Sequence, residues 1–123
     1  MSELIGQLGG KATTGADPVA VTDTESTVVG PVDVQMWDRC TVYVKNEGGG
    51  GGHALTLCNI ETAPLEAGPW VPHDTCLSAN LASGAAVAPF FFNLSMKYVR
   101  IRAKCGAANN TTIRVWVSVG GHP

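Results

Sequence analysis

Apolar and polar residues alternate with a period of two along most of the chain after residue 26. The stretches that alternate are 28–36, 40–45, 54–59, 98–105 and 112–119. Successive side chains of a strand point to opposite faces of a sheet, so each stretch predicts a strand with one buried face. A continuous apolar run at residues 90–94 predicts a further, more buried strand.

No helical period is sustained over 11 residues, and glycine, proline and asparagine separate the alternating stretches. This pattern predicts an all-β fold, an antiparallel β-sandwich or jelly roll of about seven or eight strands over residues 26–123. Pro31 predicts a bulge or a strand start, and Pro72 predicts that any strand around it lies at a sheet edge. Residues 1–25 lack a sustained period and predict an extended N-terminal arm.

Five consecutive glycines, Gly48–Gly52, follow the stretch 40–45 and precede the stretch 54–59. A phosphate-binding loop would lead into a helix through a Lys-Ser or Lys-Thr pair, and neither is present. A linker is also disfavoured, because the chain before it is too short for an independent sandwich. The segment instead predicts the flexible or exposed tip of a hairpin that joins the two strands.

Charge is distributed unevenly along the chain. Residues 1–74 hold ten acids and three basic residues, a net charge of −7, whereas residues 75–123 hold five basic residues and no acid. Packing within the fold can mix the two halves, or the acidic face of one subunit can meet the basic face of the next. Only 15% of the residues are charged, which favours a surface partly covered by other subunits.

A basic patch is predicted near the C-terminus if the strands 98–105 and 112–119 pair across residues 106–110. Arg100 and Arg102 would then share an outer face with Arg114 and Trp116, together with Lys104. Such a patch can bind single-stranded nucleic acid, or it can contact a neighbouring protein. The isoelectric point of about 5.8 makes nucleic acid the less favoured partner.

Neither a metal site nor a catalytic site is favoured. His53, Cys58, His73 and Cys76 offer zinc-ligand chemistry, but their spacing matches no common zinc motif, and Cys58 falls opposite the inward leucines in the alternation. Cys76 beside His73 and Asp74 has the residue types of a nucleophilic site without the required context. We therefore expect no enzyme activity, no cofactor, and four cysteines that are buried free thiols, although disulfides that form outside a cell remain an alternative.

Aromatic residues keep a carbohydrate-binding or host-surface-binding module open as an alternative, because small β-sandwiches often carry aromatic side chains on one exposed face. Each candidate is also a typical core or interface residue. The candidates are Trp37, Tyr43, Trp70, Tyr98 and Trp116. The N-terminal sequence resembles no secretory signal and no apolar stretch is long enough to span a membrane, so synthesis in a cytosol without a membrane partner is expected.

The chain resembles the small β-sandwich virion proteins of tailed bacteriophages, in particular the capsid decoration, or cement, proteins. The resemblance rests on a short chain of low charge, a glycine-rich N-terminal arm, a series of strands, and the segments 67–72 (AGPWVP) and 97–102 (KYVRIR). It implies a non-enzymatic protein on the outer capsid surface of the virion. Such a protein binds the major capsid protein, often as a homotrimer, and stabilises the assembled head.

An extended arm can also add a strand to the exposed sheet edge of a neighbour, where main-chain hydrogen bonds hold it. Leu4, Ile5 and Leu8 would be the apolar anchors of this arm. Arg100, Arg102, Arg114 and Trp116 would form a second contact with the partner.

Overall fold

The structure is a computed structural model that describes residues 12–15, 17–34 and 37–120. Within these residues the chain is all-β, as predicted. The strands are β2 (Ala12–Gly15), β3 (Val19–Val21), β4 (Ser26–Asp33), β5 (Arg39–Asn46), β6 (Leu55–Ala63), β7 (Val71–Thr75), β8 (Ala86–Val87), β9 (Phe90–Phe91), β10 (Tyr98–Cys105) and β11 (Thr111–Gly120). The described residues contain no helix that is long and apolar enough to cross a membrane.

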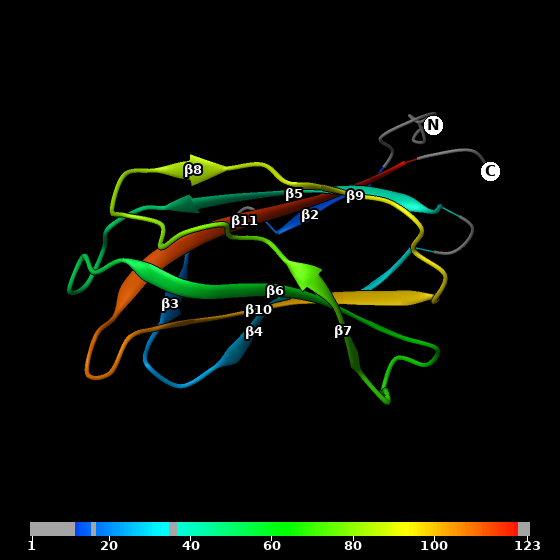
Figure 1. Cartoon of the computed structure of the whole chain (residues 1–123), viewed down its shortest axis with the longest axis horizontal. Helices are drawn as coiled ribbons and strands as arrows, with labels where there is room; N and C mark the ends of the chain where they lie inside the picture. The colour runs from blue at the N-terminus through cyan, green and yellow to red at the C-terminus, as the bar shows by residue number, and fades with distance from the viewer. Residues whose placement is uncertain (1–11, 16, 35–36, 121–123) are drawn as a thin grey trace.

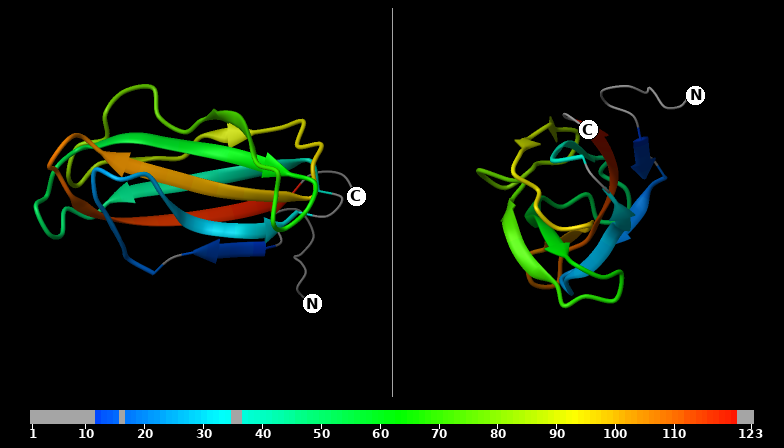
Figure 2. Two further views of the ribbon diagram at one scale, coloured as in Figure 1. Left: turned by 90° about the horizontal axis from the view of Figure 1, so that it is seen from below. Right: turned by 90° about the vertical axis from the view of Figure 1, so that its right-hand side faces the viewer.

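Two antiparallel sheets form the layers of a β-sandwich (Figure 1). The four-stranded sheet has the order β4-β10-β6-β7. The six-stranded sheet has the order β2-β11-β5-β8, with β3 pairing with β11 and β9 pairing with β5. In two further views the long strands of both layers are aligned along a common axis and surround a shared interior (Figure 2).

The core lies between the sheets and is built by the predicted alternation. Along β10 and β11 every second side chain is buried, and the intervening ones are partly exposed. Ile60 and Ile101 from one sheet and Ile113 from the other are fully buried in this core. Burying each such side chain contributes roughly 1.5–3 kcal/mol, so the alternation accounts for much of the driving force for folding.

Both predicted hairpins are wrong, because each short connection joins the two sheets. β5 belongs to the six-stranded sheet and β6 to the four-stranded sheet, so Gly48–Gly52 crosses between the layers. Residues 106–110 likewise connect β10 in one sheet to β11 in the other. The actual neighbours are β10 with β6 and β11 with β5, each paired over eight residues.

The predictions from the two prolines are confirmed. Gly30 and Pro31 on β4 together face only Arg100 on β10, which makes a β-bulge at this edge of the four-stranded sheet. Pro72 lies in β7, the opposite edge strand of the same sheet, and a second irregularity in register accompanies it. Both edges of this sheet therefore carry a residue that cannot donate a main-chain hydrogen bond.

Two expectations about which side chains face the core need correction. Thr56 is an extra residue in β6 opposite the end of β10, and this bulge turns both Leu55 and Cys58 inward while Leu57 is only partly buried. In the apolar run 90–94 only Phe90–Phe91 form a strand, and Phe90 remains exposed. A local pattern cannot reveal an extra residue in one strand, because its effect depends on the partner strand.

The N-terminal segment is described from Ala12 onward. β2 and β3 both pair with β11 and extend one edge of the six-stranded sheet. The expected boundary between arm and sandwich at residue 25 stays a prediction. The predicted anchors Leu4, Ile5 and Leu8 lie outside the described residues.

Candidate functional site

The predicted basic patch is not assembled, because its two halves lie in different sheets. Arg100 and Arg102 lie on β10 in the four-stranded sheet, and Arg114 and Trp116 lie on β11 in the six-stranded sheet. In both strands these residues alternate with buried ones, so each group occupies the outer face of its own sheet. The hypothesis of one combined surface for nucleic acid therefore loses its geometric basis.

Each of these arginines forms an ion pair with an acid from the N-terminal half of the chain. Arg100 contacts Glu61 at 2.7 Å, and its guanidinium also lies 4.5 Å from the ring centre of Trp70. Arg102 contacts Glu25 at 3.1 Å. Arg114 contacts Glu47 at 3.0 Å. Folding thus brings the acidic and basic halves together within one chain, which is one of the two alternatives that the charge distribution left open.

The glycine loop packs against another loop of its own chain. The Gly51 amide donates to the side-chain oxygen of Asn110, and the His53 amide donates to the main-chain oxygen of the same residue at 3.1 Å. A Cβ atom on Gly49 would lie 2.6 Å from the hydroxyl oxygen of Thr112. The expected exposure is confirmed at Gly50 and Gly51, but the tip also makes contacts with its own chain, which explain why small residues are required here.

Asn46, at the end of β5 beside the glycine loop, is fully buried and hydrogen-bonds to several neighbouring segments. Its amide nitrogen donates to the main-chain oxygens of His53 at 3.0 Å and Leu81 at 2.9 Å. Its side-chain oxygen accepts from the Gly48 amide at 3.0 Å and from the Thr111 hydroxyl at 2.7 Å. The amide nitrogen thus donates twice and the side-chain oxygen accepts twice. A side-chain amide that is hydrogen-bonded in this way can be buried without a large free-energy cost.

An aromatic surface lies on the six-stranded sheet, and we define it as Tyr43, Phe90, Phe92 and Trp116. Phe90 and Phe92 are 56% and 58% exposed, and their rings are stacked with centres 6.2 Å apart. Tyr43 faces Trp116 across the β5–β11 pair, and their rings meet edge to face at 5.0 Å. Large apolar rings that remain in water on one face are typical of a binding surface.

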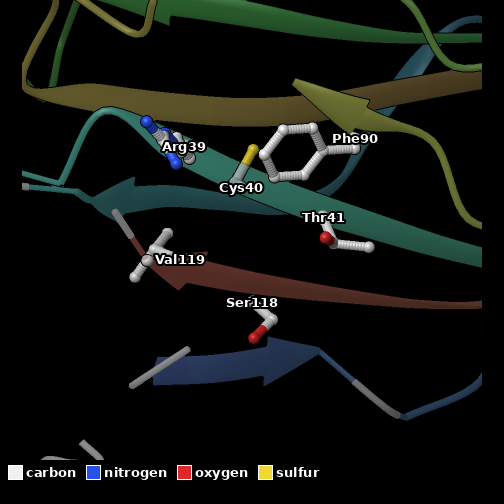
Figure 3. A pocket seen from close by; sticks show the side chains of 7 residues that line it. Arg39, Cys40, Thr41, Phe90, Ser118 and Val119 are labelled. Carbon is white, nitrogen blue, oxygen red and sulfur yellow. The ribbon is translucent and has the colours of Figure 1, made fainter. Parts of the chain in front are cut away.

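A shallow pocket of about 250 Å³ adjoins this surface (Figure 3). It crosses β11, β5 and β9, where Ser118 pairs with Thr41 and Thr41 pairs with Phe90. Arg39 lines the same pocket from β5 (Figure 3). The pocket thus offers a guanidinium group, two hydroxyl groups and the face of an aromatic ring.

The other tryptophans are less available for binding than the sequence suggests. Trp37 is packed against the core cluster. Trp70 is half-buried, and Arg100 occupies the space above its ring. Of the three tryptophans, Trp116 is therefore the one that belongs to an outer aromatic surface. Sequence reasoning missed Phe90 and Phe92 because a continuous apolar run is typical of a buried strand.

The four cysteines are buried free thiols, as predicted. Burial and the nearby Cys76 raise the pKa of the Cys40 thiol to about 12, so this group stays protonated near neutral pH. Across residues 12–15, 17–34 and 37–120, no three His, Cys, Asp or Glu side chains come together in a way that could hold a metal ion.

Comparisons with known proteins identify a similar fold. A solved structure from Bacillus endospore appendages, which form a family of disulfide-linked pili, matches with a TM-score of 0.53 and 9% sequence identity. The match covers 90% of this chain and 88% of that chain. No family model matches the sequence, and no curated protein is similar to it. At 9% identity the similarity supports the β-sandwich architecture and carries no further assignment.

Proposed function

We propose that this chain is a non-enzymatic structural subunit that associates with copies of itself and decorates the outside of an assembled phage head. The homotrimer and the contact with the major capsid protein belong to this proposal through the resemblance to decoration proteins. Synthesis occurs in the host cytoplasm, and the protein then becomes part of the virion surface. The similar fold in a pilus protein is compatible with a structural role of this kind.

The observation that carries the proposal is the aromatic surface. Phe90 and Phe92 expose more than half of their area to water, and Phe90 pairs with Thr41, two residues before the exposed Tyr43 on β5. Self-association would remove this apolar area from water, which contributes roughly 25 cal/mol per Å². The rings also have few rotatable bonds, so ordering them in an interface costs little entropy. A second copy of the chain is therefore the occupant that we assign to this surface.

The arginines contribute to the proposal in a more restricted way than the sequence indicates. Arg100, Arg102 and Arg114 are already paired with acids in the same chain. Charged pairs of this kind at the rim of a contact influence orientation and association rate more than affinity. We therefore assign the main interface to the aromatic surface and keep Trp116 as part of it.

Replacing both Phe90 and Phe92 with serine is expected to convert an oligomer into a monomer. The change removes the two most exposed rings of the aromatic surface, and neither side chain belongs to the core. Light scattering coupled to size-exclusion chromatography measures the molar mass directly. Thermal unfolding of the variant should stay within a few degrees of the wild type, because surface substitutions usually change stability by less than 0.5 kcal/mol.

Leu65→Ser is the matched control for this experiment. Leu65 is 64% exposed, but it lies in the connection between β6 and β7 of the other sheet. The control should retain the wild-type mass. A wild-type protein that is monomeric at micromolar concentrations, or a double variant that assembles normally, would contradict the assigned interface.

Deleting residues 2–11 is expected to abolish attachment to the particle while the sandwich still folds. The deletion stops before β2, so the pairing of β2 and β3 with β11 is kept. It removes Leu4, Ile5 and Leu8, the proposed anchors of strand addition to a neighbour. Co-sedimentation with particles that lack the native protein measures attachment. Normal attachment by the truncated protein would disprove the role of the arm.

Immunogold labelling of native particles separates the head-decoration proposal from other structural roles. Labelling over icosahedral heads supports it, and labelling confined to tails, fibres or pilus-like filaments replaces it with another assembly. The result is independent of the interface experiment, since any of these assemblies can use the aromatic surface.

Carbohydrate binding is the second candidate, and the pocket beside Phe90 favours it. Hydroxyl groups from Thr41 and Ser118 and the guanidinium of Arg39 can hydrogen-bond a sugar while the ring of Phe90 stacks on its apolar face. A glycan array probed with the wild-type protein decides between the two functions. Binding that disappears in Thr41→Val, with the oligomeric state unchanged, would support a glycan module.

A further inference from the structure

Two of the buried cysteines face each other across neighbouring strands. Cys58 lies on β6 and Cys76 lies one residue after β7. The register continues from the pairs Ile60–Asp74 and Asn59–Thr75, and the amide of Cys76 donates to the main-chain oxygen of Cys58 at 2.7 Å. Both side chains are buried in the core cluster.

This arrangement fits the backbone geometry of a disulfide. Directly opposed residues of an antiparallel pair have Cα atoms about 4.5–5.5 Å apart, and disulfides bridge Cα atoms about 4.4–6.8 Å apart. The two residues are opposed on neighbouring strands, and both side chains are buried in the core cluster. Bond formation therefore needs side-chain rotation and a small approach of the two strands, with no change in strand pairing.

Within the described residues, no other two cysteines lie opposite each other on neighbouring strands. Cys105 makes its contact elsewhere, with the main-chain oxygen of Val21 at 3.8 Å. Cys40 lies on β5 in the opposite sheet, near enough to Cys76 for that group to raise the pKa of Cys40. Cys40 is therefore the competing partner that an experiment must distinguish from Cys58.

The position of β7 gives an oxidant a route to these thiols. β7 is an edge strand of five residues, and four of its five side chains are exposed. Pro72 removes one donor from its pairing with β6. Short edge strands open locally at a smaller free-energy cost than the whole fold. Such opening exposes Cys76, which is 5% exposed in the closed structure, before Cys58, which is fully buried.

Interaction with the neighbouring Cys58 thiol, followed by burial, raises the pKa of Cys76 well above its usual range. The thiolate is the form that attacks a disulfide, so exchange is slow while β7 is closed. Opening the strand returns the thiol toward water and restores its ordinary acidity. Oxidation is therefore expected to depend on local opening, and mild denaturant should accelerate it.

We propose that Cys58 and Cys76 are a dithiol site that a low-molecular-weight disulfide such as oxidised glutathione converts into an intramolecular disulfide. The Cys76 thiolate attacks one sulfur of oxidised glutathione, and one glutathione thiolate leaves. The Cys58 thiolate then attacks Cys76 in this mixed disulfide and releases the second glutathione. The two cysteines lose two protons and two electrons, and one oxidised glutathione becomes two reduced ones. The product ties edge strand β7 to β6.

The test is oxidation of the full chain with excess oxidised glutathione in buffer that contains urea well below the unfolding midpoint. Peptide mapping without reductant should show a Cys58–Cys76 linked peptide, and the intact mass should fall by two hydrogens. The disulfide closes the loop from Cys58 to Cys76 and so restricts the unfolded chain. The melting temperature is therefore expected to rise by about 10 °C and to fall back to its original value after reduction with dithiothreitol.

Cys105→Ser is the matched control and should give the same linked peptide and the same shift. Cys76→Ser should give neither. The reversible shift in the wild type needs no variant, so a folding defect in Cys76→Ser would leave the experiment decisive. A linked peptide that joins Cys40 to Cys76, or stable mixed disulfides without any link, would overturn the assignment.

Discussion

Replacing Asn46 with alanine is expected to lower the free energy of unfolding by about 3 to 4 kcal/mol. The substitution leaves the main-chain oxygen of His53 without the Asn46 donor and leaves the oxygen of Leu81 with the Leu55 amide as its remaining donor. It also removes the acceptor of the Gly48 amide and of the Thr111 hydroxyl. Each buried polar group left without a partner costs about 1–3 kcal/mol. Urea unfolding followed by tryptophan fluorescence measures the change as a shift of the midpoint at constant slope.

Two further variants show whether the hydrogen bonds carry this effect. Asn46→Asp keeps the shape but cannot donate to either oxygen when ionised, so its stability should fall as pH rises and partly recover in acid, where the carboxyl can donate once. Thr111→Val removes one donor to Asn46 and should cost only about 1 kcal/mol. An alanine variant as stable as Thr111→Val would show that the network contributes little.

The strands were predictable because strand side chains alternate between faces. Residues 98–105 were predicted as a strand with the bounds that β10 has, and β11 differs by one residue at each end from the predicted 112–119. Pairing was not predictable from the same signal. Alternation states which face is buried but does not name the neighbouring strand, and the connections at 47–54 and 106–110 are long enough to reach either sheet.

The contacts of the candidate site were harder to predict from the sequence than the strands. The arginines were correctly placed on outer faces. Their acidic partners come from segments far away in sequence, so the ion pairs could not be predicted from the sequence pattern. Phe90 and Phe92 were assigned to a buried strand because hydropathy does not report exposure. Asn46 was the one residue with an overlooked signal: it continues the inward series of Val42 and Val44, which marks a buried polar group at the end of β5.

The second large effect is expected at Gly30, where alanine should lower the free energy of unfolding by about 3 to 5 kcal/mol. Gly30 has a φ of +112°, a conformation that residues with a Cβ atom rarely adopt. An added Cβ would also lie 2.9 Å from the Cα and Cβ atoms of Arg100 and from the main-chain oxygen of Val99. Two of these atoms are backbone, so β4 must move away from β10 to accept the methyl group.

Gly84→Ala separates the two causes, because Gly84 also has a positive φ of +86° and a Cβ there meets nothing within 4 Å. This control should cost about 1–2 kcal/mol from the backbone conformation alone, and the difference between the variants measures the contact with β10. Equal losses at both positions would show that the edge strand shifts freely. A large difference would show that the bulge holds β4 in a fixed position, and a fixed bulge keeps this edge unsuitable for strand addition. Subunit contacts would then depend on the six-stranded sheet, which carries the aromatic surface.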